Sequence, residues 1–212
     1  MSLDLAAIRR IQLPAGQFQD EAAPKSQIVL HHTASGDGAA GDIQYWANTP
    51  ERVATAFVLE RSGILYQAFH SSRWAYHLGI SHPRWPQHDR QSIGIEIDSW
   101  GYLEKKGDRF FSWAGVEVPA DRVQKYDIWK GCRYFEKYTP AQIATLRDLL
   151  IYLGEKYRIP LGFGFEIFDL NRRALNIEPG VFAHASYRKD KTDAHPQPEL
   201  LALGSELKDR IK

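Results

Sequence analysis

Cysteine is almost absent from this chain of 212 residues, which contains Cys132 alone. A single cysteine cannot form an internal disulfide, so folding does not depend on an oxidising compartment, and a cysteine-rich zinc site is excluded. No stretch approaches the roughly 20 apolar residues that cross a membrane, and Met1 to Asp20 lack the layout of a signal peptide. We therefore expect a protein that is cytoplasmic at synthesis and not membrane-bound, with release by lysis or delivery to the cell wall as later fates.

An excess of charge of either sign is also missing. The chain has 27 lysines and arginines against 26 acidic residues, for a formal net charge of +1. Nucleic acids and anionic membranes attract proteins through clustered positive charge, so neither is expected as the main partner. Aromatic residues, in contrast, make up 12% of the chain and include six tryptophans. The length suits one well-packed domain with room for an insertion.

Apolar runs and helical patterns alternate along the chain. Strands are expected at residues 27–31, 53–59, 64–69, 92–97 and 181–184. A short helix is expected after Asp42, which caps it, and two more over 139–157 and 198–212. Thr139, Pro140 and Gln142 form a strong helix start, and the turn at 60–63 requires an antiparallel pair. The pattern predicts an α/β fold, a single domain with a mixed central β-sheet flanked by helices.

Two segments stand apart from this domain of residues 27–212. Residues 1–26 are interpreted as an N-terminal leader lying on the surface. Residues 99–138 are rich in aromatic side chains and are interpreted as an insertion, because about 40 residues can hardly build an independent core. We expect the aromatic side chains of the insertion to pack it onto the main body, with the lining of a substrate groove as the alternative.

Three polar side chains that zinc prefers follow apolar runs far apart in the sequence. His31 ends the run 28–30, His184 ends the run 181–183, and Asp193 lies nine residues further along a polar loop. Two histidines and one carboxylate leave the fourth position of a tetrahedral site open for water. His31 and His32 point to opposite faces if the strand continues, so one of them is expected to be a ligand, and the pattern itself does not choose between them.

Two further side chains suit acid–base and electrostatic roles. Glu96 alternates with Ile95 and Ile97, so it is expected in a wall of low dielectric constant that raises its pKa and suits it to proton transfer. The alternative is a solvated position on an edge strand. Lys191 lies two residues before Asp193 and is placed to stabilise an oxyanion, unless it is a solvated loop lysine.

Five segments, taken in order, resemble the zinc-dependent N-acetylmuramoyl-L-alanine amidase family, the type 2 amidases, which includes T7 lysozyme and the peptidoglycan recognition proteins. They are His31-His32-Thr33-Ala34-Ser35, Ala56 to Gly63, Ala75-Tyr76-His77-Leu78-Gly79, Ser92 to Glu96, and His184 with Lys191-Thr192-Asp193. The resemblance spans about 28–195 and selects His31 over His32 as the ligand.

The resemblance implies a Zn²⁺ site formed by His31, His184 and Asp193, with Glu96 and Lys191 as catalytic residues. It implies hydrolysis of the amide between N-acetylmuramic acid and L-alanine in peptidoglycan or a muropeptide, as in an endolysin, a wall-recycling enzyme or a delivered effector. His77 is expected to contact substrate or to support the site.

The chain departs from the family pattern at several positions, one of which is Ala183-His184-Ala185 where members often carry Gly before the histidine. The sequence Asp193-Ala194-His195-Pro196 makes His195 a rival third ligand, and Thr55 stands where some members carry a catalytic tyrosine. One alternative function is a non-catalytic peptidoglycan-binding module of the same fold, whose mark would be a lost ligand. Another is an amidase acting on a different N-acyl amino-acid amide.

Overall fold

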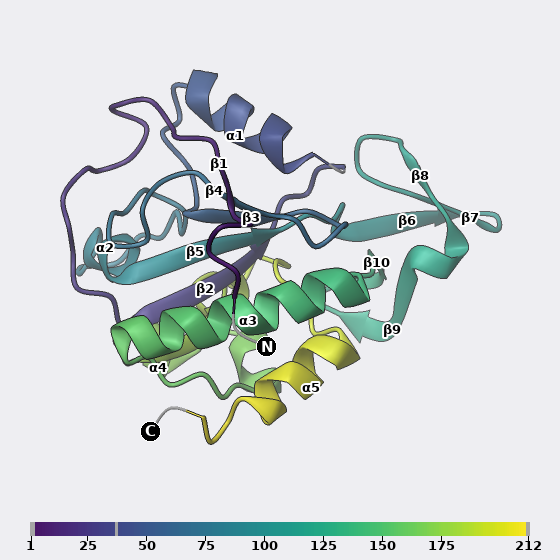
Figure 1. Cartoon of the computed structure of the whole chain (residues 1–212). Helices are drawn as coiled ribbons and strands as arrows, with labels where there is room; N and C mark the ends of the chain where they lie inside the picture. Colours follow the sequence, from purple (N-terminus) through teal and green to yellow (C-terminus); the bar gives the residue numbers. More distant parts are fainter. Residues whose placement is uncertain (1–2, 37, 211–212) are drawn as a thin grey trace.

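The computed structural model describes residues 3–36 and 38–210, and its centre is a six-stranded mixed sheet (Figure 1). The strand order is β1-β4-β3-β5-β2-β11. The strands are β1 (Arg9–Arg10), β2 (Gln27–His32), β3 (Phe57–Leu59), β4 (Leu65–Gln67), β5 (Ser92–Ile97) and β11 (Gly180–Ala183). The hairpin partners β3 and β4 are antiparallel, whereas β3, β5, β2 and β11 run parallel. The predicted mixed α/β sheet is confirmed.

The parallel strands are buried on both faces, as their uninterrupted apolar sequences predict. Every residue of β2 is buried. The carboxyl ends of β2, β5 and β11 meet at one edge of the sheet, and β2 and β5 are in a register that places His31 opposite Glu96. Ligands of open α/β sheets bind at this edge. The pairing thus brings residues from three distant segments to one place.

Helices cover both sides of the sheet (Figure 1). They are α1 (Ala39–Asn48), α2 (Gln87–Gln91), α3 (Pro140–Tyr157), α4 (Arg172–Leu175) and α5 (Pro198–Glu206), with 3₁₀ turns η1 (Ala120–Arg122), η2 (Phe165–Phe168) and η3 (His184–Ser186). Helices α3 and α5 lie together on one side, and α1 lies on the other. Within residues 3–36 and 38–210, no helix is long and apolar enough to span a membrane.

The helix ends confirm one prediction and correct two. The capping box of α3 is present, with Thr139 accepting a hydrogen bond from the Gln142 backbone. Helix α1 begins at Ala39 rather than after Asp42, whose carboxylate instead accepts a hydrogen bond from the Ser35 hydroxyl at 2.9 Å. Helix α5 ends at Glu206, because the chain then closes into tighter turns, and residues 211–212 of the predicted helix lie outside the described part.

The N-terminal segment does more than lie on the surface. Most of its described residues are exposed, but β1 pairs in parallel with β4. The buried Leu13 continues this edge, and its backbone N–H donates to the carbonyl of Ala68 at 2.9 Å. An open strand edge carries unpaired backbone groups, and this segment satisfies those of β4.

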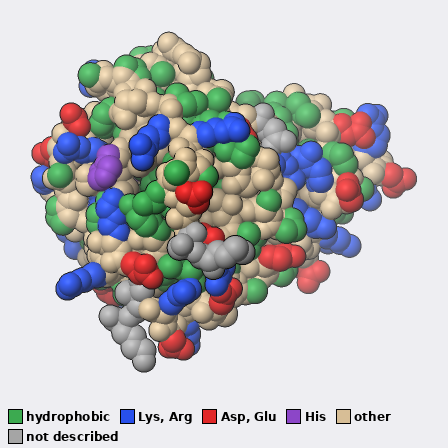
Figure 2. Space-filling view, viewed as in Figure 1, with side chains coloured by type: hydrophobic (Ala, Val, Ile, Leu, Met, Phe, Trp, Pro, Cys, Tyr) green, Lys and Arg blue, Asp and Glu red, His purple; other side chains and the backbone are tan. Residues whose placement is uncertain are grey.

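The insertion at 99–138 folds into a second sheet that continues from the end of β5 (Figure 1). Its strand order is β8-β7-β6-β10-β9, and all its pairs are antiparallel. The strands are β6 (Tyr102–Lys106), β7 (Arg109–Phe111), β8 (Glu117–Val118), β9 (Val123–Trp129) and β10 (Cys132–Glu136). Basic and acidic side chains gather together at the outer end of this lobe (Figure 2), as in the ion pair between Arg109 and Glu117. The mixture of signs matches the near-zero net charge of the chain.

Candidate metal centre

Three side chains converge at the carboxyl edge of the main sheet. His31 lies near the end of β2, His184 follows β11 directly, and Asp193 lies in the loop beyond η3. The two Nδ1 atoms are 3.1 Å apart, and Asp193 Oδ2 lies 3.0 Å from Nδ1 of His31 and 2.8 Å from Nδ1 of His184. Among the described residues, these three side chains form a group that can hold a metal ion. The structure therefore brings together the ligand set predicted from the sequence.

Hydrogen bonds behind His31 determine which of its nitrogens faces the cluster. The Ser92 hydroxyl donates to the carbonyl of His88 at 2.7 Å, so Nε2 of His77 must donate to Ser92 Oγ at 2.8 Å. Nδ1 of His77 is then an acceptor, and it takes the Nε2 proton of His31 at 2.9 Å. This leaves a lone pair on Nδ1 of His31, directed at His184 and Asp193.

His184 is oriented in the same way. Its Nε2 lies 2.8 Å from the carbonyl oxygen of Leu78, which can only accept, so Nε2 carries the proton and Nδ1 the lone pair. Two lone pairs and a carboxylate oxygen facing one another repel unless a cation lies between them. A tetrahedral zinc ion with bonds of about 2.0–2.1 Å needs ligand atoms spaced by about 3.3 Å, close to the spacing observed. The donor set fits a divalent metal.

The segment that supplies these supporting groups is held by a buried carboxylate. Asp89 Oδ1 accepts the backbone N–H groups of His77 and Leu78 at 2.9 and 3.0 Å. Sequence reasoning missed Asp89 and Ser92 as supports, because neither follows a periodic pattern. The signal available for Ser92 was its place in the segment Ser92 to Glu96, which resembles the family pattern.

Burial keeps the imidazoles of His31 and His77 neutral. It lowers the pKa of His31 to about 4, and it holds the pKa of His77 well below its usual value. A neutral imidazole is the form that binds a metal ion, so His31 is ready for a cation at neutral pH.

Glu96 lies beside this cluster with a carboxyl group suited to proton transfer. It lines the same hollow of about 330 Å³ as His31, His184 and Asp193. Burial raises its pKa well above the usual value, and the neighbouring carboxylates of Asp193 and others add to the effect. Its buried Oε2 atom has no hydrogen-bond partner within the described part of the chain. A perturbed, unpartnered carboxyl group in a cleft is typical of a general acid or base.

Lys191 lines the same hollow, as the sequence analysis expects, and it also lines a smaller hollow that adjoins it. His77 lines both as well, but its two ring nitrogens are engaged by His31 and Ser92. This arrangement favours support of His31 over contact with substrate.

The rival ligand candidates are not part of this group of three, although His32 lines the same hollow. His32 faces Gly101, where a Cβ atom would lie 2.3 Å from its Nε2. His195 stacks on Tyr138, donates from Nε2 to the carbonyl of Glu136 at 3.0 Å, and accepts from the Tyr126 hydroxyl at 2.8 Å. The structure thus places Asp193, and not His195, with His31 and His184.

Thr55 offers no substitute for the tyrosine that some family members carry. Its hydroxyl donates to the carbonyl of Phe57 at 3.0 Å, and its methyl group packs on Gly94, where a Cβ would lie only 2.7 Å away.

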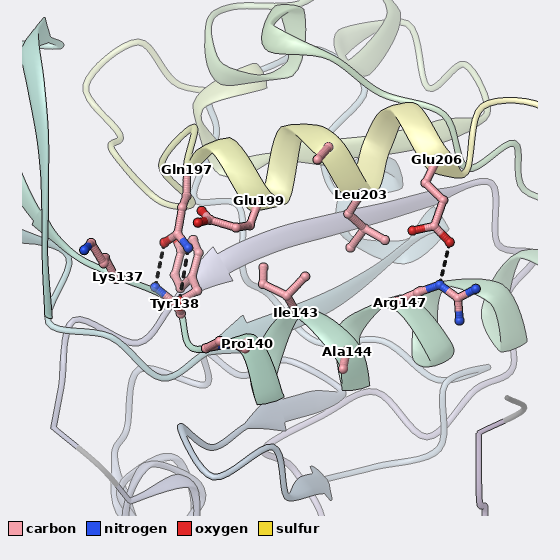
Figure 3. A pocket seen from close by; sticks show the side chains of 11 residues that line it. Lys137, Tyr138, Pro140, Ile143, Ala144, Arg147, Gln197, Glu199, Leu203 and Glu206 are labelled. Carbon is pink, nitrogen blue, oxygen red and sulfur yellow. Dashed lines mark hydrogen bonds and ion pairs between the residues drawn. The ribbon is translucent and has the colours of Figure 1, made fainter.

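A larger hollow, of about 480 Å³, lies between α3 and α5, away from this cluster (Figure 3). Ile143 and Leu203 face each other across it, and an ion pair between Arg147 and Glu206 closes one end. No histidine or cysteine is among the described residues that line it. Size alone therefore does not locate the chemistry, whereas the converging donor atoms do.

Fold and site together define an α/β protein with a buried pair of histidines and an aspartate at the carboxyl edge of a mixed sheet. Residues 21–197 match the family model described as N-acetylmuramoyl-L-alanine amidase. The chain belongs to this family, which confirms the resemblance found in its motifs. No curated protein sequence matches the chain.

Solved structures of similar fold cover nearly the whole chain. AmpD, as a selenomethionine derivative, is 20% identical with a TM-score of 0.55, covering 96% of this chain and 99% of that one. PlyL is 17% identical with a TM-score of 0.52, covering 89% and 86%. The N-acetylmuramoyl-L-alanine amidase LysC from Clostridium intestinale URNW is 14% identical with a TM-score of 0.52, covering 96% and 99%. At these identities the likeness shows a shared fold.

The supporting role of His77 can be tested by metal affinity. Replacing His77 with alanine removes the acceptor that orients His31, and we expect zinc affinity to fall about 10–100-fold, the usual effect of losing such a partner. Competition with a chromophoric chelator measures this. His70→Ala is the matched control, since His70 is exposed and its ring bonds only to neighbouring Ser72 among the described contacts. Unchanged affinity in His77→Ala would contradict the role.

Proposed function

We propose that this protein is a zinc-dependent amidase that hydrolyses the bond between N-acetylmuramic acid and L-alanine in peptidoglycan or its fragments. The observation that carries the proposal is the convergence of His31, His184 and Asp193 with Glu96 in one hollow. Membership of the amidase family supports the same reaction. A binding module without catalysis would need neither a complete ligand set nor a buried carboxyl group beside it.

His31, His184 and Asp193 would hold the zinc ion. When bound, zinc supplies Lewis-acid polarisation of a carbonyl group and lowers the pKa of water toward neutrality. The protein's own part is to keep both Nδ1 lone pairs aimed at the Asp193 carboxylate, which the hydrogen bonds from His31 to His77 and from His184 to Leu78 do.

Glu96 and Lys191 would carry the remaining steps. In this proposal Glu96 takes a proton from the attacking water onto its carboxylate and then passes it to the leaving amine of L-alanine. The raised pKa of the Glu96 carboxyl group suits both halves of this transfer, because the group must first accept and then release a proton. The Lys191 ammonium would stabilise the negative charge that develops on the carbonyl oxygen.

Digestion of purified sacculi tests the proposal directly. We expect the protein to release stem peptides with free L-alanine amino termini, identified by mass spectrometry. A chelator should abolish the release, and added zinc should restore it, because the zinc ion is the Lewis acid that the proposed reaction requires. Intact sacculi and intact soluble muropeptides, despite one bound zinc per chain, would show that the enzyme acts on another amide.

A further inference from the structure

Two aromatic side chains from the insertion line the hollow of the candidate metal centre, and a third lies next to one of them. Trp100 and Tyr102 line the same hollow as His31 and Asp193. Trp113 lies next to Trp100, with its ring edge-on and the two centroids 6.5 Å apart. The insertion at 99–138 therefore contributes Trp100 and Tyr102 to the lining of the cleft. The expectation that the insertion's aromatic side chains serve packing therefore does not cover these three.

Contacts hold Trp113 and Trp100 in place, and the side chains of Trp113 and Tyr102 are exposed. Trp113 Nε1 donates to the carbonyl oxygen of Ala34 at 2.7 Å, yet 61% of the residue is exposed. The ring of Trp100 packs so closely on Gly36 that a Cβ there would lie 3.0 Å from it. Tyr102 is 39% exposed. An exposed tryptophan fixed by a hydrogen bond presents a rigid apolar face at low entropic cost, as binding sites do.

The cleft differs in character on its other side. The smaller hollow, of about 180 Å³, adjoins the first at His77 and His184, and Arg188 and Lys191 line it. None of the described residues lining it comes from the insertion. The first hollow thus carries the aromatic faces of Trp100 and Tyr102. The smaller one carries Lys191, which lines both hollows, and Arg188, which is ion-paired with Asp190.

We propose that Trp100, Tyr102 and Trp113 form a subsite for the sugar ring of the substrate, which leaves the stem peptide to extend past His184 toward Arg188. The proposal rests on the proposed amidase function. A pyranose ring has apolar C–H faces and a polar rim, which suit an amphipathic aromatic surface. N-acetylmuramic acid is joined to the scissile amide through its lactyl group, so the sugar must lie next to the metal centre, as these rings do.

The assignment also agrees with charge. The carboxylates of a stem peptide are attracted to the ammonium of Lys191, whereas the charge of Arg188 is already paired with Asp190. The sugar itself is neutral and gains nothing there.

The test compares two substrates that differ only in the sugar: an N-acetylmuramoyl peptide and the same peptide acylated with D-lactate alone. We expect Trp113→Ala to lower the ratio of the two kcat/KM values about tenfold, equivalent to about 1.4 kcal/mol. Trp113→Phe keeps a ring and should recover part of the ratio. Tyr45→Ala is the control, because Tyr45 on α1 is exposed to a similar extent, 59%, and should leave the ratio unchanged.

A second measurement separates the subsite from the reaction. Saturation-transfer NMR with free N-acetylmuramic acid should show binding to the wild type that weakens in Trp113→Ala. Equal loss on both substrates, or wild-type cleavage that ignores the sugar, would overturn the subsite and leave the amidase function standing. Sugar binding that depends on Trp113, without cleavage of either substrate by the zinc-loaded protein, would support the subsite and overturn the proposed function.

Discussion

Replacing Glu96 with glutamine is expected to lower kcat by about 10²–10⁴-fold while leaving zinc binding intact. Glutamine has nearly the shape of glutamate but cannot accept the proton of the attacking water. The structural cost should be small, because Oε2 of Glu96 has no hydrogen-bond partner among the described residues. A loss of turnover without a loss of metal would therefore identify a proton-transfer role.

The measurement is single-turnover hydrolysis of a soluble muropeptide, with zinc content determined on the same samples. Glu155→Gln is the matched control, since Glu155 is an exposed glutamate on α3. Wild-type rates in zinc-loaded Glu96→Gln would remove Glu96 from the mechanism. Loss of zinc in that variant would instead assign Glu96 to metal binding.

The pH profile gives an independent readout of the same group. Burial raises the pKa of Glu96, and the base must be ionised to act, so the wild-type rate should fall as pH drops through that raised pKa. The charge of a bound zinc ion shifts the carboxyl pKa back downward and so moves this limb to lower pH. The residual rate of Glu96→Gln should lack the limb, because glutamine does not titrate.

Replacing Asp193 with alanine is expected to abolish zinc binding at micromolar metal and, with it, measurable hydrolysis. In the proposed site Asp193 would supply one of three ligand atoms, and it contacts both histidines within 3.0 Å. Losing a ligand should cost more than the 10–100-fold that follows loss of an outer partner, so we expect zinc affinity to fall by more than about 100-fold. The variant should also lose the zinc-dependent rise in Tm. In the wild type, zinc at 1,000 times its Kd should add about 4 kcal/mol to the free energy of unfolding.

The His195→Gln variant tests whether His195, rather than Asp193, is the third zinc ligand. His195 is buried against Tyr138 and bonded to Tyr126, so its replacement should lower Tm. The folded variant should nevertheless bind one zinc ion per chain, measured by elemental analysis, because its ring does not face the cluster. Zinc lost in His195→Gln but retained in Asp193→Ala would reverse the ligand assignment.

The elements that were predicted well are those with local causes. The helix α3 follows from Thr139, Pro140 and Gln142, whose cap needs no distant partner. The strand β2 follows from the apolar run 28–30. The polar β1 escaped prediction because its partner β4 lies far away in the sequence. The strands of the insertion pair mostly with sequence neighbours, but charged residues interrupt their apolar pattern.

By itself the sequence determined the fold class, the family and the identities of His31, His184, Asp193 and Glu96 as candidates, since these rest on residue type, local periodicity and motif order. Only the tertiary structure decided how those residues are arranged. Its register places His31 opposite Glu96, its hydrogen bonds turn both Nδ1 atoms toward Asp193, and its insertion carries Trp100 and Tyr102 to the cleft. Such distances and orientations depend on contacts between segments far apart in the chain, which local pattern does not encode.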